Sequence, residues 1–454
     1  MSKKIPHLSS AVPFVGKALM FNRNPVRLLQ EGFNRHGEVF SFTLFGKTVN
    51  ALIGPEANEV FFKAGDDQLG ARDAYRFTVP IFGPGVAYDV EPERMSDQLR
   101  FVHPSLRNRP MQSYAQIMAE ESDRFLDTWG DSGEIDLPAA LNELTIFISG
   151  RCLLGEDFRQ HLSAEFAKLY KDLEGGINLV AFFNPYIPLP AMRRRDAARH
   201  RLVQLISGVI AERRASGTAK DDFLNALMEA RYGDGTALDD AAITGILLTL
   251  LFAGQHTSAI LATWVGLLLH QHPRELQRAK AELVGLGDRP SVDDLKGLQH
   301  LQRCIRETER LHPPLIMLMR TVLEPIDCLG YQLPAGSLAM VSPAVSHRLS
   351  SVFTNPDSFD PDRFAPGREE GCEHTYAQIS FGGGKHKCIG EAFAYQQIKV
   401  IWARILARFE LEVPAVEYTP DYRTFVVGPR QCCQVRYRRR QASPQPAVVE
   451  EVVA

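Results

Sequence analysis

The longest apolar stretch of this chain, Ile243 to Leu269, limits the folds that the sequence can adopt. Its length would suit a helix that crosses a membrane. Four successive polar residues, Gln255 to Ser258, interrupt the stretch near its centre, and polar groups are costly inside a bilayer. We therefore expect a buried helix of a large globular protein, with a polar notch that faces a cofactor. A helix kinked at Gly254, whose polar side chains are satisfied by neighbours, is the alternative.

A single cysteine, Cys388, closes a glycine-rich and cationic loop that begins at Phe381. A helix-like run follows it directly. The partial positive charge of a helix N-terminus lowers the cost of a thiolate, and Lys385, His386 and Lys387 add to this effect. Glycines let a large planar ligand approach the backbone, and a thiolate held in this way suits haem iron. The loop alone does not separate this interpretation from an ordinary buried thiol.

A second motif contains Glu307 and Arg310, which lie three residues apart and share one face of a helix. Pro313 and Pro314 end that helix. A buried Glu–Arg pair is stable only if its remaining donors find partners. Arg363, in an Asp-Pro-Asp-Arg-Phe segment, offers a second cation for this purpose. An exposed ion pair is the common alternative.

These motifs, taken in this order, resemble the cytochrome P-450 superfamily of haem-thiolate monooxygenases, over roughly residues 10 to 440. The segment Tyr75 to Asp89 is similar to the substrate loop of the sterol 14-alpha-demethylases. Two segments, 315–320 and 435–440, resemble the bacterial members of that family. His256 stands where the superfamily usually has an acid, and His386 stands where the cysteine loop usually has an arginine.

The resemblance implies a mainly α fold with a smaller β region, the triangular helical prism of the cytochrome P-450 fold around a buried haem. The sequence pattern agrees, with a β-hairpin over Glu38–Ile53, mostly helix from about 113 to 310, and strands and turns over Thr321–Ser342. We expect one domain over residues 1–440. Residues 441–454 are rich in Pro, Ala, Val and Glu and are expected to be a linker or tail that leads to a further domain, such as a fused ferredoxin.

The net charge, the cysteine spacing and the N-terminal residues argue against several classes of function. A net charge of −3 argues against a nucleic-acid partner. The seven cysteines show no CxxC pair and no zinc-like spacing, which suits a reducing cytoplasm. Residues 1–20 contain no apolar stretch long enough for a signal peptide or a transmembrane anchor. We therefore expect a soluble, cytoplasmic bacterial enzyme.

The resemblance also implies roles for individual residues. Cys388 would ligate the iron of haem b, within the loop that contains Phe381 and Gly382. Tyr75, Arg320 and His386 would bind the haem propionates, since two cations and a phenol can each bond a carboxylate. Ser96 departs from the family, which often has a basic residue there, so that contact is not expected.

Thr257 would donate to the bound dioxygen, and His256 would feed protons to it because imidazole titrates near neutral pH. A structural histidine bonded to a neighbouring carboxylate is the alternative for His256. Glu307, Arg310 and Arg363 would have a structural role.

The expected substrate is a flat, apolar sterol similar to lanosterol. Its 14-alpha methyl would be removed in three oxidations with release of formate. The residues expected to line its pocket are apolar: Phe77, Phe82, Phe252, Ala253, Leu315, Ile316 and Met317. Phe425 and Val426 are further candidates, and plain core packing is the alternative for every one of these residues.

Electrons would come from NAD(P)H through a ferredoxin reductase and an acidic ferredoxin, with Lys385 and Lys387 on the docking face. Three other functions stay open at this point. The first is a haem-thiolate hydroxylase that acts on another terpenoid or lipid. The second is a non-catalytic protein that binds haem or a sterol. The third, which the polar notch favours least, is a membrane channel or carrier built on Ile243–Leu269.

Overall fold

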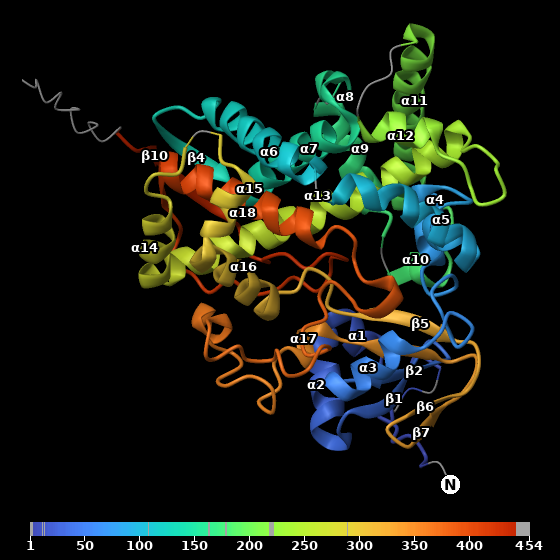
Figure 1. The fold of residues 1–454 in the computed structure, drawn as a ribbon. Coiled ribbons are helices and arrows are strands. Elements are labelled where there is room, and N and C mark those ends of the chain that lie inside the picture. The colour runs from blue at the N-terminus through green and yellow to red at the C-terminus, as the bar shows by residue number, and fades with distance from the viewer. Residues whose placement is uncertain are drawn as a thin grey trace, which may run out of the picture.

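The structure, a computed structural model, describes residues 3–10, 12, 14–107, 109–161, 164–177, 179–217, 222–287 and 289–441 (Figure 1). The predicted linker or tail therefore lies outside the described residues, apart from Gln441. Helices dominate the fold. Their bounds are α1 Ala18–Arg23, α2 Pro25–His36, α3 Pro55–Lys63, α4 Val79–Phe82, α5 Pro92–Val102, α6 Arg109–Asp127, α7 Leu137–Leu154, α8 Glu156–His161, α9 Ala164–Glu174, α10 Leu179–Phe183, α11 Pro190–Ser216, α12 Phe223–Glu229, α13 Asp240–Gln271, α14 Pro273–Glu282, α15 Val292–Gly297, α16 Gln299–Leu311, α17 Pro343–Ser346 and α18 Glu391–Arg408.

Within the described residues, ten short strands form three sheets. The five-stranded sheet has the order β1-β2-β8-β5-β3, the second sheet has the order β4-β10-β9, and β6 pairs with β7. Only β2 and β8 run parallel among these pairs. The strands are β1 Val39–Leu44, β2 Lys47–Leu52, β3 Leu69–Gly70, β4 Ser132–Asp136, β5 Leu318–Val322, β6 Ile326–Cys328, β7 Tyr331–Leu333, β8 Leu338–Val341, β9 Phe409–Glu412 and β10 Gln434–Arg439. In Figure 1 the five-stranded sheet lies below the main helices, and β4 and β10 lie at the opposite end of the molecule.

Helix α13 is the centre of the core, and α7, α16 and α18 all pack against it (Figure 1). It begins at the cap Asp239, whose carboxylate accepts from the Ala242 N–H group. Gly266 lets α18 approach closely, since a Cβ there would lie 2.1 Å from the Trp402 ring. The Trp402 indole donates to the Ala262 carbonyl over 2.8 Å, so its ring is buried without an unsatisfied donor.

Helices α7 and α13 are, within the described part of the chain, the two that are long and apolar enough to cross a membrane. Most of the apolar segment of each is buried inside the molecule. The core helix predicted for Ile243–Leu269 is therefore what the structure has.

The predicted β-hairpin is formed by β1 and β2, with Leu44 paired to Lys47. The two residues of its turn, Phe45 and Gly46, both have positive φ, at 45° and 80°. This is the turn geometry that fits the twist of a two-residue hairpin. The stretch expected to be mostly helical contains one exception, because Ser132–Asp136 forms β4 and pairs with β10 from the far end of the chain. That pairing is long-range, and local periodicity carries no signal for it.

Candidate functional site

One face of α13 stays open in the middle of the core. Ala253 is exposed, and Leu250, Gly254 and Thr257 are only half-buried, although the residues on the other faces are buried. The spacing of these four residues places them on one side of a helix. A Cβ at Gly254 would meet no atom within 4 Å. The Thr257 hydroxyl donates to the Ala253 carbonyl over 2.6 Å, which holds it at the edge of this face.

His256 pairs with a carboxylate that comes from a different helix. Its Nδ1 contacts Glu174, the last residue of α9, and both side chains are about one-fifth exposed, at 20% and 22%. A histidine bonded to a neighbouring carboxylate is the alternative that the sequence leaves open beside a proton-feeding role. Both side chains are thus partly open to solvent, and the contact joins α9 to α13 beside Thr257, the next residue of α13.

The cysteine loop is held by its own backbone and by α3. Gly384 has a φ of +59°, and a Cβ there would lie 2.1 Å from the Phe62 carbonyl oxygen, so only glycine fits. The Cys388 N–H group donates to the Phe381 carbonyl over 2.8 Å. Gly382 also has a positive φ of 70°. The loop thus delivers Cys388 to the first turn of α18.

Burial by the surrounding protein raises the pKa of the Cys388 thiol, although part of its side chain is exposed. The N–H groups of Gly390 and Glu391, at the start of α18, act in the opposite direction, and so does the charge of Lys387. Glu391 raises this pKa by charge repulsion. A thiol that coordinates a metal cation loses its proton to solvent. The N–H groups of Gly390 and Glu391 would then stabilise the negative charge on the sulfur.

Three polar side chains gather near Cys388 and leave donors free. Arg320, on β5, is 5% exposed and lies over the Phe61 ring at 5.0 Å, and its guanidinium makes no hydrogen bond to any described residue. Tyr75 and Tyr88 stack with ring centroids 4.5 Å apart. Burial raises the pKa of both phenols, Arg320 opposes this, and the charge of Cys388 adds to the effect on Tyr88. A buried cation beside two phenols has the donors that a carboxylate needs.

His386 is less free than the sequence suggested. Its Nε2 contacts Asp66 at 2.5 Å, and Lys385 contacts the other oxygen of the same carboxylate at 2.5 Å. Burial lowers the pKa of His386, and Asp66 opposes that shift. Only Nδ1 of this imidazole therefore remains available for a propionate.

The Glu307 cluster is complete and fully buried. Arg310 contacts both oxygens of Glu307, at 2.8 and 2.9 Å, and Arg363 donates to Oε1 over 2.9 Å. All three side chains are 0% exposed. The remaining donors of Arg310 bond the carbonyls of His347, Pro356 and Ser358. Every charge is thus paired, which is the condition for burying such a group.

Comparison with known proteins decides the family. The Cytochrome P450 family profile matches residues 6–432. The chain belongs to the cytochrome P450 family. Within it the chain belongs to the sterol 14-demethylases, since it is 40% identical to sterol 14-demethylase from Arabidopsis thaliana, over 96% of this chain and 92% of that protein.

Other relatives agree. Obtusifoliol 14-alpha demethylase of Sorghum bicolor is 38% identical, over 97% of this chain and 91% of that protein. Human lanosterol 14-alpha demethylase is 37% identical, over 96% and 87%. The retinoic acid-bound cyanobacterial CYP120A1 superposes with a TM-score of 0.86 at 22% identity, over 97% of this chain and 100% of that one, and this likeness shows the shared fold. The predicted fold class and family are confirmed.

Cytochromes P450 bind haem and use dioxygen, and this site fits haem. Cys388 offers a thiolate supported by two N–H groups, and Arg320 has a buried guanidinium nitrogen that no described residue bonds. The open face of α13 around Gly254 leaves room for a planar group. These features are otherwise unfavourable in a folded core, because an unpaired buried cation and an unfilled helix face both cost stability.

The residues predicted to bind the substrate fall into separate clusters of this P450. Phe82 and Phe252 pack edge to face at 5.6 Å, and Tyr170 of α9 stacks on Phe252 at 6.0 Å. Phe77 contacts Phe425 at 5.6 Å. The aromatic residues predicted to bind the substrate therefore form two clusters, one around Phe82 and Phe252 and one around Phe77 and Phe425.

The other predicted pocket residues differ in burial. Ala253 lies on the open face of α13, and Leu315 is half-buried. Ile316 packs against Ala344 and Val427, and Met317 packs against the core beneath the five-stranded sheet. Ile316 therefore has core contacts, and its place in the substrate pocket stays a prediction.

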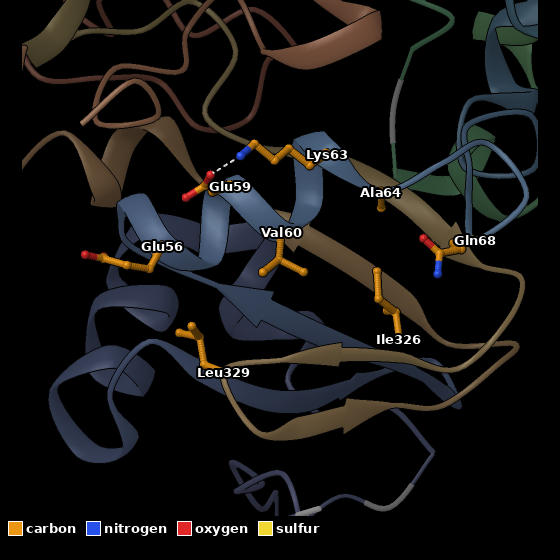
Figure 2. A pocket seen from close by; sticks show the side chains of 8 residues that line it. All are labelled: Glu56, Glu59, Val60, Lys63, Ala64, Gln68, Ile326 and Leu329. Atoms are coloured by element: carbon orange, nitrogen blue, oxygen red, sulfur yellow. Dashed lines mark ion pairs between the residues drawn. The ribbon is translucent and has the colours of Figure 1, made fainter. Parts of the chain in front are cut away.

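Two surface grooves have no residue of α13 in their lining. One runs between α3 and the β6–β7 hairpin, with Val60, Ala64, Ile326 and Leu329 among its apolar lining residues (Figure 2). It contains none of the predicted site residues. The second groove lies beside the cysteine loop, and it is lined by Asp66, Pro92, Met95, Ser96, Leu99, Arg100, His103, Pro104, Arg107, Lys385 and His386.

Four further residues, Asp66, Tyr88, Tyr170 and Glu174, contact the predicted site residues but were not predicted from the sequence. Tyr88 lies inside the quoted segment Tyr75–Asp89, so a search for a second phenol within that segment would have found it. Asp66 and Glu174 meet histidines that are distant in sequence, and no local pattern marks them. Their importance follows only from the fold.

Proposed function

We propose that this P450 acts as a sterol 14-alpha-demethylase that depends on haem b ligated by Cys388. The observation that carries this is the convergence of Cys388, Tyr75, Tyr88 and Arg320, in a chain of the sterol 14-demethylase family. Arg320 and the two phenols bind the propionates, and Nδ1 of His386 is a further donor. Phe381 and Gly382 shape the loop that presents the sulfur.

When bound, haem with a thiolate ligand activates dioxygen for insertion into unreactive C–H bonds. The chain itself supplies protons and excludes water. Thr257 is placed on the open face of α13 to donate a proton there, and the His256–Glu174 pair resupplies it from solvent. Phe82 and Phe252, both buried and packed edge to face, make part of this region apolar.

The proposed substrate is a sterol of the lanosterol or obtusifoliol type. Its 14-alpha methyl becomes an alcohol, then an aldehyde, and finally leaves as formate, with a 14,15 double bond left behind. Each of the three oxidations consumes one dioxygen and two electrons. The Phe77–Phe425 and Phe82–Phe252 clusters present flat apolar surfaces to the rings, which suits a rigid ligand of this shape.

Electrons reach this centre from NAD(P)H through separate redox proteins. We propose a small acidic ferredoxin with its reductase as the donor system. The groove beside the cysteine loop supports this, because Arg100, Arg107 and Lys385 line it. Arg100 pairs with Asp97 and Lys385 pairs with Asp66, so Arg107 supplies the excess positive charge. Lys387, the residue after His386, is 55% exposed and pairs with Glu391.

We also propose a soluble, cytoplasmic bacterial enzyme. The burial of α7 and α13 inside the molecule supports solubility, because neither apolar helix is presented to a bilayer. Release of the expressed full-length chain into the supernatant without detergent is the expected result. Recovery only from the membrane fraction would contradict it.

The decisive experiment is a reconstituted turnover. The purified haem protein is incubated with a bacterial ferredoxin, its reductase, NADPH and lanosterol or obtusifoliol, and products are identified by mass spectrometry. A 14-demethylated, 14,15-unsaturated sterol with formate is expected. NADPH consumption without a sterol product moves the substrate to another terpenoid or lipid.

A matched variant tests the ligand. Cys388→Ser is expected to lose the thiolate-type ferrous–CO spectrum and all sterol turnover, whereas Cys372→Ser, at another exposed cysteine, should retain both. An unchanged spectrum in Cys388→Ser would overturn the assignment of the ligand.

A further inference from the structure

A buried carboxyl group lies between α16 and α18 and has no cation of its own. Glu309 is 3% exposed, and its Oε2 accepts a hydrogen bond from the Tyr395 hydroxyl. No lysine, arginine or histidine among the described residues forms an ion pair with it. Glu307, two residues earlier on the same helix, has two arginines. A buried carboxylate without such a partner is costly, so its presence needs a reason.

The charged groups around Glu309 are few. Arg306, on its own helix, lowers the pKa of Glu309 at a distance, but its Nε donates to Gln378 over 2.7 Å and not to the carboxylate. Glu391 of α18 raises this pKa by repulsion, and the Tyr395 and Ser380 hydroxyls lower it. Burial outweighs these effects and raises the pKa of Glu309 to about 7.

Glu309 connects to the cysteine loop through aromatic and backbone contacts. The Tyr395 ring lies 5.5 Å from the Phe381 ring, and the Phe381 carbonyl accepts from the Cys388 N–H group over 2.8 Å. Ser380, the residue before Phe381, has a buried hydroxyl that makes no hydrogen bond of normal geometry with the described residues, and it faces the same carboxyl. The loop that presents the sulfur therefore rests on this cluster at its Phe381 end.

We propose that Glu309 is a positioning residue for the thiolate: through Tyr395 it holds the Phe381 end of the cysteine loop, and its negative charge, when present, makes the haem centre harder to reduce. The physical reason is that a carboxylate in a medium of low dielectric stabilises the more positive, oxidised state of a nearby metal centre. The inference rests on the proposed ligation of haem by Cys388. It adds a control of electron transfer that depends on pH.

The test measures midpoint reduction potentials of the purified haem protein at pH 6 and pH 8. At pH 6 wild type and Glu309→Gln are expected to be close, because both carry a neutral side chain there. At pH 8 the wild-type potential should lie below that of Glu309→Gln. Glu373→Gln, at an exposed carboxylate, is the matched control and should follow wild type at both pH values.

Tyr395→Phe provides a second variant that keeps the ring and the packing on Phe381. It removes the hydrogen bond that favours the carboxylate, so the pH at which the potential changes should rise by about one unit. The same pH dependence in wild type and Glu309→Gln would overturn the proposal, and so would a Tyr395→Phe profile that matches wild type.

The ferrous–CO spectrum separates the two ways of failing. A wild-type protein without a thiolate-type spectrum contradicts the proposed ligation by Cys388. A normal thiolate spectrum together with a potential that Glu309→Gln does not alter contradicts only the role of Glu309.

Discussion

Two buried arginines of this P450, Arg310 and Arg320, are close in sequence but have opposite surroundings. Arg310 is fully enclosed, and its donors bond Glu307 and three backbone carbonyls. Arg320 is buried as well, yet it makes no hydrogen bond to the described residues. The first cluster is finished within the protein and serves the fold. The second is unfinished, which indicates that a ligand completes it.

The largest effect is expected when the finished cluster is broken. Glu307→Leu leaves Arg310 buried without a counter-charge and leaves Arg363 with Glu370 as its remaining carboxylate, which should destabilise the protein by about 3–5 kcal/mol. Chemical unfolding followed by circular dichroism measures this. Glu134→Leu, which removes an exposed partner of Arg436, should change little. A Glu307→Leu protein as stable as wild type would show that the cluster does not hold the fold.

Glu309 gives a pH-dependent version of the same comparison. Its pKa is raised in the folded protein to about 7 from the ordinary value of 4.5, so the folded state favours the protonated form. Wild-type stability should therefore fall, relative to Glu309→Gln, as the pH rises from about 4.5 to 7, and the cost is complete above that range. The relative loss is about 3 kcal/mol. Unfolding free energies of both proteins at pH 5 and pH 8 check this, and a difference independent of pH would contradict it.

The finished cluster was the easier one to predict from sequence. Glu307 and Arg310 share a helix face by their spacing alone, and Cys388 stands in a loop whose glycines and cations are consecutive. The partners of the two site histidines were not predictable, because Asp66 meets His386 and Glu174 meets His256 across long stretches of chain. The strand β4 was missed for the same reason, since β10 lies at the other end of the sequence. Local spacing encodes faces of single elements, and contacts between elements require the fold.

The pair of His256 and Glu174 either serves the fold, as the Glu307 cluster does, or takes part in the reaction, as Arg320 is proposed to do. If the pair feeds protons to Thr257, His256→Ala should lower sterol turnover by about 10²-fold and increase peroxide release. Glu174→Gln should also lower sterol turnover and increase peroxide release, but by a smaller factor. His200→Ala, at an exposed histidine of α11, is the control. Wild-type turnover and coupling in His256→Ala would assign the pair to structure alone.

The smallest and sharpest change is Arg320→Lys. Lysine keeps the positive charge but loses the planar fork that bonds a carboxylate through two donors. Loss of haem to a scavenger protein should become about tenfold faster, which corresponds to about one hydrogen bond to a charged group. The stability of the haem-free protein should stay the same, because the Arg320 guanidinium makes no hydrogen bond to the described residues.

Arg310→Lys is the matched control. It should lower the free energy of unfolding and leave the rate of haem loss from the folded protein unchanged. If Arg320→Lys instead destabilises the haem-free protein as strongly as Arg310→Lys, both arginines serve the fold, and an unpaired buried donor no longer marks the haem site.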